Sequence, residues 1–256
     1  MTYIQDTAGL LARFKSISKP ALLTVTIIVC SVFMPVNAHA QRVNPMAFEL
    51  TPSGSDSTAV LRVENTSQTK MTIELSASKI SIDENGDEER LPAEDDFLIF
   101  PPQAFLDAGK VQSVRVKYIG DPAITQSEAY RIKVSQVPID ITGEGQSAIG
   151  LVVNFHTLAT VAPKNAKIDL VVTSIRPNAS GAWDMVIENK GSKMARLSRT
   201  NWNVSDGTTS KSFSSQEVAD MTDKNLVMPG GKMALSIPAL EGINPATAQI
   251  KINVPS

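Results

Sequence analysis

After its first forty residues, the sequence is a succession of short runs in which apolar and polar residues alternate. Examples are "AVLRVEN", "VQSVRVKYI", "YRIKVSQV" and "WDMVIEN", which are rich in β-branched residues. Turn signals such as "TPSGSDS" and "IGDP" separate the runs. Alternation with period two places every second side chain on one face of a strand. The pattern and its spacing predict an all-β sandwich protein. The nearest helix candidate, "SSQEVADMTDKN", is too polar for a helix to be predicted there.

The N-terminal segment has the three parts of a secretory signal. Arg13, Lys15 and Lys19 are basic, Ala21 to Val36 is apolar, and "NAHA" ends the segment in a small-x-small pattern. We therefore predict a signal peptide over residues 1–40 that is removed by cleavage. An uncleaved membrane anchor is the alternative, but the apolar run contains a proline and is short against the roughly 20 residues of a spanning helix.

Composition argues against most enzyme classes. Residues 41–256 contain no cysteine and a single histidine, His156, so they offer neither disulfides nor an ordinary zinc site, and the usual general base is scarce. No G-x-S-x-G elbow or phosphate-binding glycine loop is present. These residues carry 21 basic and 25 acidic side chains, and nucleic-acid binders usually show a basic excess. We expect a non-enzyme without cofactor, metal, small-molecule substrate or nucleic-acid partner.

Weak self-similarity divides the chain into two halves. "VEN" at residues 63–65 precedes Lys70-Met71, much as "IEN" at 187–189 precedes Lys193-Met194. Likewise, Gly109-Lys110 precedes "VQSV" as Gly231-Lys232 precedes "MALS". The offsets of 124 and 122 residues nearly agree. We predict two related sandwiches in tandem, over residues 41–162 and 163–256.

The acidic segment "DENGDEERLPAE" allows two interpretations. Asp83, Asn85, Asp87 and Glu94 fit positions in a calcium-binding loop, but the required glycine is replaced by Glu88 and no helices are expected on either side. A charged hairpin turn is the better interpretation, because "ENGD" contains residues that tolerate positive φ.

The stretch "SAIGLVVNFHTLATVAP", residues 147–163, has an apolar alternation on its odd positions. Ile149, Leu151, Val153 and Phe155 would share one face of a strand, while most even positions are small or polar. Taken alone, the pattern favours an interior strand whose apolar face serves its own sandwich. His156 lies on the other face, where a packed or exposed histidine is the simplest interpretation.

The segment "FPPQAFLDAGKVQSVRVKYIGDP", residues 100–122, resembles the periplasmic pilus chaperones of the chaperone/usher pathway. The matching positions are Pro101, Pro102, Leu106, Ala108-Gly109, Gln112, Val114 and Arg115. "SEAYRIKVSQVPI" resembles the next family segment through Glu128, Tyr130, Val137 and Pro138. The resemblance extends from about Val43 to the C-terminus and is weaker in the second half.

The resemblance implies two immunoglobulin-like domains with a cleft between them, in a protein of the bacterial periplasm. In that family the last strand of the first domain is lent to an incomplete pilus subunit, which is then delivered to an outer-membrane usher. Ile149, Leu151, Val153 and Phe155 would be the lent side chains, each worth about 1.5 to 3 kcal/mol when buried. Such a strand adds to the edge of the partner's sheet. An exposed apolar edge is an aggregation hazard, so self-association of the free protein is also expected.

The sequence departs from the family at the cleft. Members carry an arginine and a lysine that hold the subunit's terminal carboxylate, and the matching positions here are near Ala47 to Glu49 and at Leu158. The arginine of the family's interdomain ion pair is replaced by Ala162, although Glu128 remains. We expect His156 and Lys164 to act as substitute carboxylate anchors.

Two other functions stay open. A structural surface-fibre subunit or adhesin built of tandem sandwiches would have the same strand pattern. An envelope enzyme or carbohydrate-binding module is less favoured, because two tryptophans and three tyrosines leave few stacking platforms for sugars.

Overall fold

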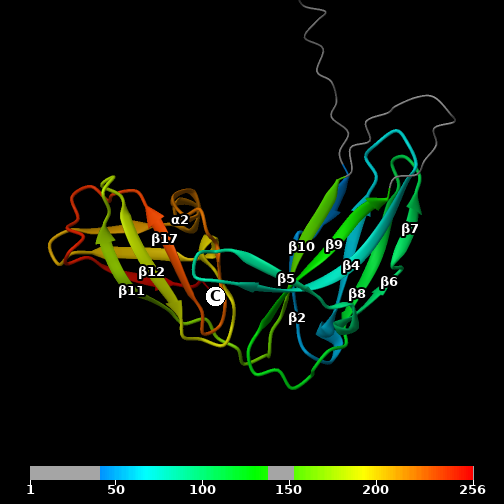
Figure 1. Cartoon of the computed structure of the whole chain (residues 1–256), viewed down its shortest axis with the longest axis horizontal. Helices are drawn as coiled ribbons and strands as arrows, with labels where there is room; N and C mark the ends of the chain where they lie inside the picture. Colours follow the sequence, from blue (N-terminus) through cyan, green and yellow to red (C-terminus); the bar gives the residue numbers. More distant parts are fainter. Residues whose placement is uncertain (1–40, 138–152, 256) are drawn as a thin grey trace, which may run out of the picture. The chain divides into compact units, whose positions relative to one another are not determined.

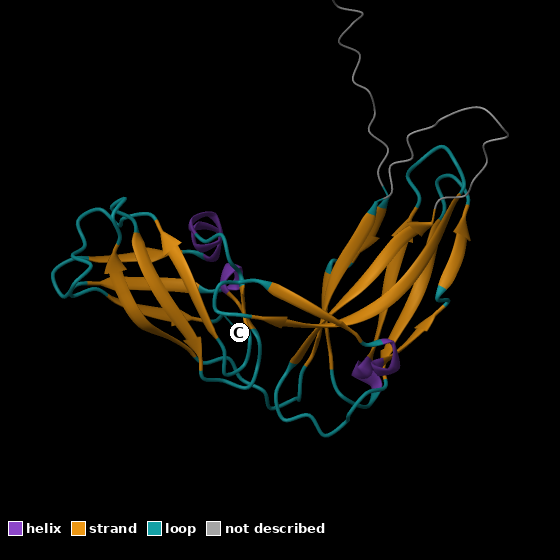
Figure 2. Ribbon diagram, in the orientation of Figure 1, coloured by secondary structure: helices purple, strands orange, loops and turns teal. Residues whose placement is uncertain are grey.

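The computed structural model describes residues 41–137 and 153–255, and Ala40–Ser256 form one compact unit. Strands make up most of the regular structure, as Figures 1 and 2 show. The predicted all-β class is therefore confirmed. Among the described residues, no helix is long and apolar enough to cross a membrane.

The first sandwich consists of two facing sheets. One sheet has the order β1-β3-β8-β6 and is antiparallel throughout. The other has the order β2-β10-β9-β4-β5, and β7 also pairs with β4. The strands of the first sheet are β1 (Arg42–Asn44), β3 (Thr58–Glu64), β8 (Val111–Tyr118) and β6 (Phe97–Phe100). Those of the second are β2 (Ala47–Leu50), β10 (Asn154–Val161), β9 (Glu128–Val137), β4 (Met71–Ile82), β5 (Glu88–Pro92) and β7 (Gln103–Leu106). Two short 3₁₀ turns are η1 (Ser55–Ser57) and η2 (Glu94–Asp96).

The core of the first sandwich lies between these sheets and is built from alternate residues of the facing strands. Its fully buried members include Leu61, Val63, Ile73, Val114, Val116, Ile132, Val134 and Val161. The first chain segment crosses between the layers, because β1 pairs with β3 in one sheet and β2 pairs with β10 in the other.

The second sandwich has a three-stranded sheet on each side and a short bridging pair. One sheet is β11 (Leu170–Pro177), β12 (Trp183–Asn189) and β17 (Lys232–Ile237). The other is β15 (Ser210–Phe213), β14 (Asn201–Ser205) and β18 (Gln249–Asn253). The pair is β13 (Ala195–Arg196) with β16 (Leu226–Val227), and a 3₁₀ turn η3 spans Leu197–Arg199. Both tryptophans of the chain, Trp183 and Trp202, are buried in this core.

The polar segment that we did not assign to a helix contains α2 (Ser215–Met221). Its N-terminus is closed by a capping box, in which the Ser214 side chain accepts a hydrogen bond from the Glu217 amide and Glu217 accepts one from the Ser214 amide. Val218 is the one fully buried residue of the helix. A single buried side chain and a good cap are therefore enough to hold two turns of helix against the sandwich.

The acidic segment "DENGDEE" forms a hairpin turn between β4 and β5, as predicted. The amide of Asp83 donates to the carbonyl of Asp87 at 3.2 Å, and the amide of Asp87 donates to Asp83 Oδ1 at 2.9 Å. Gly86 has a φ of 85°, a conformation that glycine adopts without strain.

The weak sequence repeat corresponds to the same arrangement of buried side-chain hydrogen bonds in both sandwiches. Asn65 and Asn189 are fully buried at the ends of β3 and β12. The Asn65 side chain donates to the carbonyls of Thr69 and Leu106, at 2.7 and 3.1 Å. The Asn189 side chain donates to the carbonyls of Lys193 and Val227, at 2.8 and 3.2 Å. Each asparagine thus ties the loop that follows its strand to a neighbouring segment.

The backbone repeats this equivalence and corrects one detail of it. The carbonyl of Asn65 accepts from the Gly109 amide at 2.8 Å, and the carbonyl of Asn189 accepts from the Gly230 amide at 2.8 Å. Gly109 and Gly230 have φ values of 70° and 68°. Gly109 therefore corresponds to Gly230, and our alignment with Gly231 was wrong by one residue. In both turns the left-handed residue is the glycine whose amide donates to the asparagine carbonyl.

Because Asn189 satisfies several buried backbone groups, we expect Asn189→Ala to lower the free energy of unfolding by about 2–4 kcal/mol. Urea unfolding followed by tryptophan fluorescence measures this effect, since both tryptophans report on the second sandwich. Asn203→Ala is the matched control, because Asn203 is exposed on β14 and its loss should cost less than about 0.5 kcal/mol. Equal losses in the two variants would contradict the prediction.

Candidate functional site

Strand β10 is paired on both sides along only half of its length. It pairs with β9 from Asn154 to Val161, but its parallel pairing with β2 extends only from Leu158 to Val161. Among the described residues, no strand pairs with the other edge of residues 154–157. The backbone groups that point outward there are open to another strand. This half of β10 is the candidate site (Figure 1).

The two faces of β10 have different surroundings. On the odd face, Ala159 and Val161 are buried in the first core and Phe155 packs partly buried against it. Val153, just before the strand, is half-buried. The odd face is thus continuous with the core of the first sandwich from Val161 to Phe155, with buried Thr157 as its polar member. Ile149 and Leu151 lie outside the described residues, so their role as lent side chains stays a prediction.

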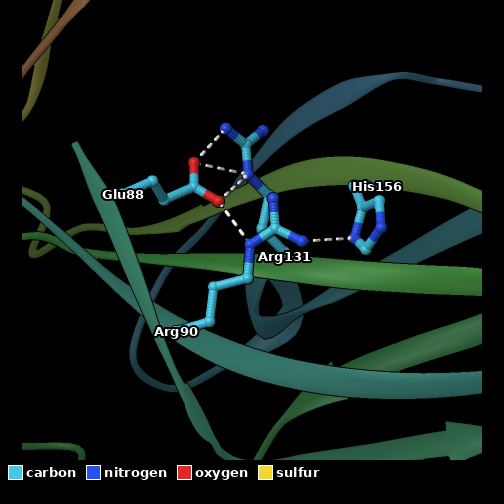
Figure 3. Close-up of polar contacts among 4 residues, drawn as sticks. All are labelled: Glu88, Arg90, Arg131 and His156. Atoms are coloured by element: carbon cyan, nitrogen blue, oxygen red, sulfur yellow. Dashed lines mark hydrogen bonds and ion pairs between the residues drawn. The ribbon is translucent and has the colours of Figure 1, made fainter. Parts of the chain in front are cut away.

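The even face of β10 carries a polar cluster, shown in Figure 3. Glu88 of β5 accepts from Arg131 Nε of β9 at 3.0 Å and from Arg90 Nε at 2.6 Å. A terminal nitrogen of Arg131 donates to the same carboxylate. Nη1 of Arg90 lies 3.1 Å from Nδ1 of His156. The cluster therefore spans the sheet from β5 to β10 and holds more cations than carboxylates.

This environment lowers the pKa values of both His156 and Glu88. Burial lowers the pKa of His156, and the charges of Arg90, Lys133 and Arg131 lower it further. A guanidinium can only donate, so Nδ1 of the neutral ring is the acceptor, which protonation would remove. For Glu88, burial opposes ionisation, but hydrogen bonds from Arg131 and Arg90 outweigh it and lower the pKa of the carboxyl.

A cavity of about 240 Å³ lies beside the point where β2 joins β10. Ala47 and Leu158 are direct neighbours in the pairing of these strands, and both line the cavity. The two positions that we matched to the family's basic pair are therefore adjacent, although neither residue is basic. The polar side chains that line the cavity are Glu49, Thr160, Lys193, Arg196 and Arg199.

Arg196 is the residue of this cavity that sequence reasoning missed. Its Nε atom is buried and has no hydrogen-bond partner among the described residues. Burial lowers the pKa of its guanidinium, and the charges of Arg199 and Arg131 lower it further. Lys193, by contrast, is paired with Glu49 at 2.8 Å. A buried donor without a partner next to a second arginine is suited to an anionic group.

The two anchors that we expected from the sequence lie elsewhere. His156 belongs to the polar cluster with Arg90, and Lys164 is exposed after the end of β10. Neither side chain lines the cavity. The available signal for Arg196 was the spacing of two arginines in "ARLSR", which is too common to identify a site.

Glu128 has a different partner from the one that the family resemblance implies. With alanine at position 162, its carboxylate pairs with Lys79 and accepts from the Tyr130 hydroxyl at 2.6 Å. The adjacent Ser127 joins the segment before β13, because its hydroxyl accepts from the Met194 amide at 2.7 Å. Its amide donates to the carbonyl of Ser192 at 2.8 Å.

Known pilus-assembly chaperones are similar to this chain in sequence and in fold. Residues 43–165 match the family described as pili and flagellar-assembly chaperone, PapD N-terminal domain. No curated protein sequence matches the chain. This part of the chain is therefore similar to the N-terminal domain of PapD-like chaperones.

Solved structures share the fold at low sequence identity. The class 5 fimbriae chaperone CfaA is 17% identical over 85% of this chain and 100% of its own, with a TM-score of 0.53. SafB of Salmonella enterica, solved with the SafA pilin, is 16% identical over 78% of this chain and 85% of that chain, with a TM-score of 0.53. The E. coli chaperone DraB is 14% identical over 79% and 88%, with a TM-score of 0.50. These similarities support the fold of two sandwiches.

The pKa of His156 gives a direct test of the polar cluster. In the protein that starts at Gln41, His156 is the single histidine, so NMR can follow its ring without ambiguity. We expect a titration midpoint below the ordinary value of about 6.5. Because folding lowers this pKa, the unfolded chain binds the proton more tightly, and stability falls as the pH drops through the unfolded value.

Arg90→Met should raise the midpoint, since it removes a nearby positive charge and the donor to Nδ1. Arg115→Met removes a charge from the other sheet of the same sandwich and should leave the midpoint unchanged. A wild-type midpoint at or above the ordinary value would contradict the described cluster.

Proposed function

We propose that this protein is a non-enzymatic periplasmic chaperone that binds pilus subunits by donor-strand complementation and delivers them to an outer-membrane usher. The observation that carries the proposal is the half-paired strand β10, whose free edge begins where its apolar face leaves the core. A subunit that lacks one strand can pair with this edge and receive the alternate side chains in its own groove.

The odd face of β10 becomes less buried towards the N-terminal end of the strand. Val161 and Ala159 are buried in the first sandwich, and Phe155 is only partly covered by it. We infer that Phe155, Val153, Leu151 and Ile149 continue this face into the subunit. Each bulky side chain that moves from water into the groove would contribute about 1.5 to 3 kcal/mol. Four such side chains provide binding without a nucleotide.

The cavity at Ala47 and Leu158 is the proposed anchor for the subunit's terminal carboxylate. Arg196 and Arg199 both line this cavity, and the Nε atom of Arg196 is buried without a hydrogen-bond partner among the described residues. A carboxylate in the cavity would offset the two positive charges through charge-assisted hydrogen bonds. Arg196 and Arg199 thus take the place of the family's basic pair, and we keep His156 and Lys164 as the competing anchors that the experiment below also tests.

The predicted signal peptide and the similarity to the family support the proposals of location in the periplasm and delivery to an usher. SafB was solved with its SafA pilin, which supports subunits as the partner class for this chain as well. Self-association of the free protein would cover the open edge of β10 in the same way as a subunit. A structural fibre subunit remains the alternative, and it predicts polymers outside the cell.

The first prediction from this proposal concerns the lent strand. Leu151→Glu with Val153→Glu should abolish co-purification of a small immunoglobulin-like subunit with the tagged protein from the periplasm, because two carboxylates would have to be buried in an apolar groove. Mass spectrometry of the eluate identifies the subunit.

Asn154→Glu is the matched control, since Asn154 is exposed on the opposite face of the same edge. It should retain the subunit. If the double variant folds and keeps the same partner, β10 is an ordinary core strand. If the wild type captures no subunit, the fibre-subunit alternative is favoured.

The second prediction concerns the anchor. Arg196→Ala should weaken subunit binding by roughly 30-fold or more, because removing one side of a buried charge pair usually costs about 2–5 kcal/mol. Calorimetry with the purified subunit measures the change, and a subunit with an amidated C-terminus should bind wild type and variant equally. Arg176→Ala, an exposed arginine on β11, is the control. A loss with His156→Ala or Lys164→Ala and none with Arg196→Ala would instead assign the anchor to those residues.

A further inference from the structure

The outer face of the β1-β3-β8-β6 sheet carries exposed apolar side chains beside unpaired cations. Val60, Leu98 and Phe100 are 50%, 56% and 69% exposed, although all three are bulky and apolar. Single exposed hydrophobic residues are common, but a group of them on one sheet face usually marks an interaction site. We call the six residues Val60, Arg62, Leu98, Phe100, Arg115 and Lys117 the outer patch.

The strand register places these residues in adjacent rows. Val60 of β3, Arg115 of β8 and Phe100 of β6 lie opposite one another in one row. Lys117 and Leu98 lie opposite one another in the next row, and Arg62 is two residues from Val60 along β3. Side chains directly opposite one another on one face lie about 5 Å apart, and side chains two residues apart along a strand lie about 7 Å apart. The outer patch is thus a continuous surface of three apolar and three basic side chains.

The charge of this face is opposite to that of the whole chain. The chain has a formal net charge of −2, yet Arg62, Arg115 and Lys117 form no ion pair with any described residue. The nearby acid of the same sheet face, Glu64, is paired with Arg42 at 3.3 Å. Excess positive charge on an acidic protein favours an anionic partner.

The outer patch also contains a shallow pocket of a size that fits one side chain. Val60, Phe100, Pro101 and Arg115 line a shallow pocket with Gln112 and Ser113. An exposed phenylalanine next to arginine is typical of the residues that dominate protein interfaces. A flat sheet face with a side-chain-sized hollow favours a protein segment over a membrane, which would be met by apolar side chains projecting from loops.

We propose that the outer patch binds an acidic, extended segment of a second protein, seating one of its apolar side chains between Val60 and Phe100. The segment's carboxylates would pair with Arg62, Arg115 and Lys117. The patch belongs to the sheet that does not contain β10, so this partner can bind while β10 is occupied. The site is independent of donor-strand complementation and would remain if that function were disproved.

The experiment uses two synthetic nonapeptides with a fluorescent label, one alternating aspartate with leucine and the other alternating lysine with leucine. We expect the acidic peptide to bind the full mature chain at least about tenfold more tightly than the basic peptide in fluorescence anisotropy, a difference of about 1.4 kcal/mol. The affinity should fall as salt is raised, because exposed charges are screened. NMR shifts should map to β3, β6 and β8.

Phe100→Ser and Arg115→Glu should each weaken binding of the acidic peptide by about tenfold or more. Phe105→Ser is the matched control, because Phe105 is also 69% exposed but lies on β7, outside the patch. Leu151→Glu with Val153→Glu should leave this binding unchanged, which separates the outer patch from the lent strand.

Three results would overturn the proposal. One is equal binding of the acidic and basic peptides, and another is an equal loss in Phe105→Ser and Phe100→Ser. The third is a membrane partner, in which vesicles of phosphatidylethanolamine with roughly a quarter of phosphatidylglycerol bind the chain through the same residues and the acidic peptide does not.

Discussion

The open edge of β10 is the constraint on which the arrangement of the first sandwich depends. A strand buried on both sides needs two partners, and β10 receives its second partner only where β2 joins it at Leu158. The switch of the first chain segment from β1 to β2 therefore sets how much of β10 is closed. A longer β2 would satisfy the remaining backbone groups and remove the site. The short β2 leaves an edge whose apolar side chains still belong to the core face.

The two faces of β10 have different surroundings, because one packs against the core and the other lies beside charged groups. The odd face is apolar and continuous with the core, while the even face carries His156 beside Arg90 and Leu158 beside the cavity. Because adjacent residues of a strand point to opposite faces, one short segment can present a hydrophobic strip to one partner surface and reach a basic cavity with the other. In the proposed function, the strip supplies most of the affinity and the cavity fixes the register of the bound strand.

The sequence was sufficient for the fold class, because the fold class depends on local periodicity, while the predicted site residues stay a prediction. Alternation identified the strands, and the "VEN" and "IEN" segments corresponded to buried Asn65 and Asn189 with matching hydrogen bonds. The α2 helix was missed because it buries only Val218 and depends on a cap instead of an apolar face. Arg196 was missed because its environment is made by Ala47 and Leu158, which are distant in sequence. The boundary between residues 162 and 163 stays a prediction.

Two of the residues that depart from the family pattern, Ala47 and Leu158, lie together at the cavity. With Leu158 and Ala47 in place of basic residues, the floor of the cavity is apolar, and a charge there must come from another segment. In the proposed function, the segment "ARLSR" would supply it through Arg196, whose Nε is buried without a hydrogen-bond partner among the described residues. Ser127 joins the strand that carries Glu128 to the segment just before Arg196 through two hydrogen bonds, one made by its amide and one by its hydroxyl oxygen. In the proposed function, this contact would help to hold Arg196 near β10, where the family resemblance implies an ion pair that Ala162 cannot form.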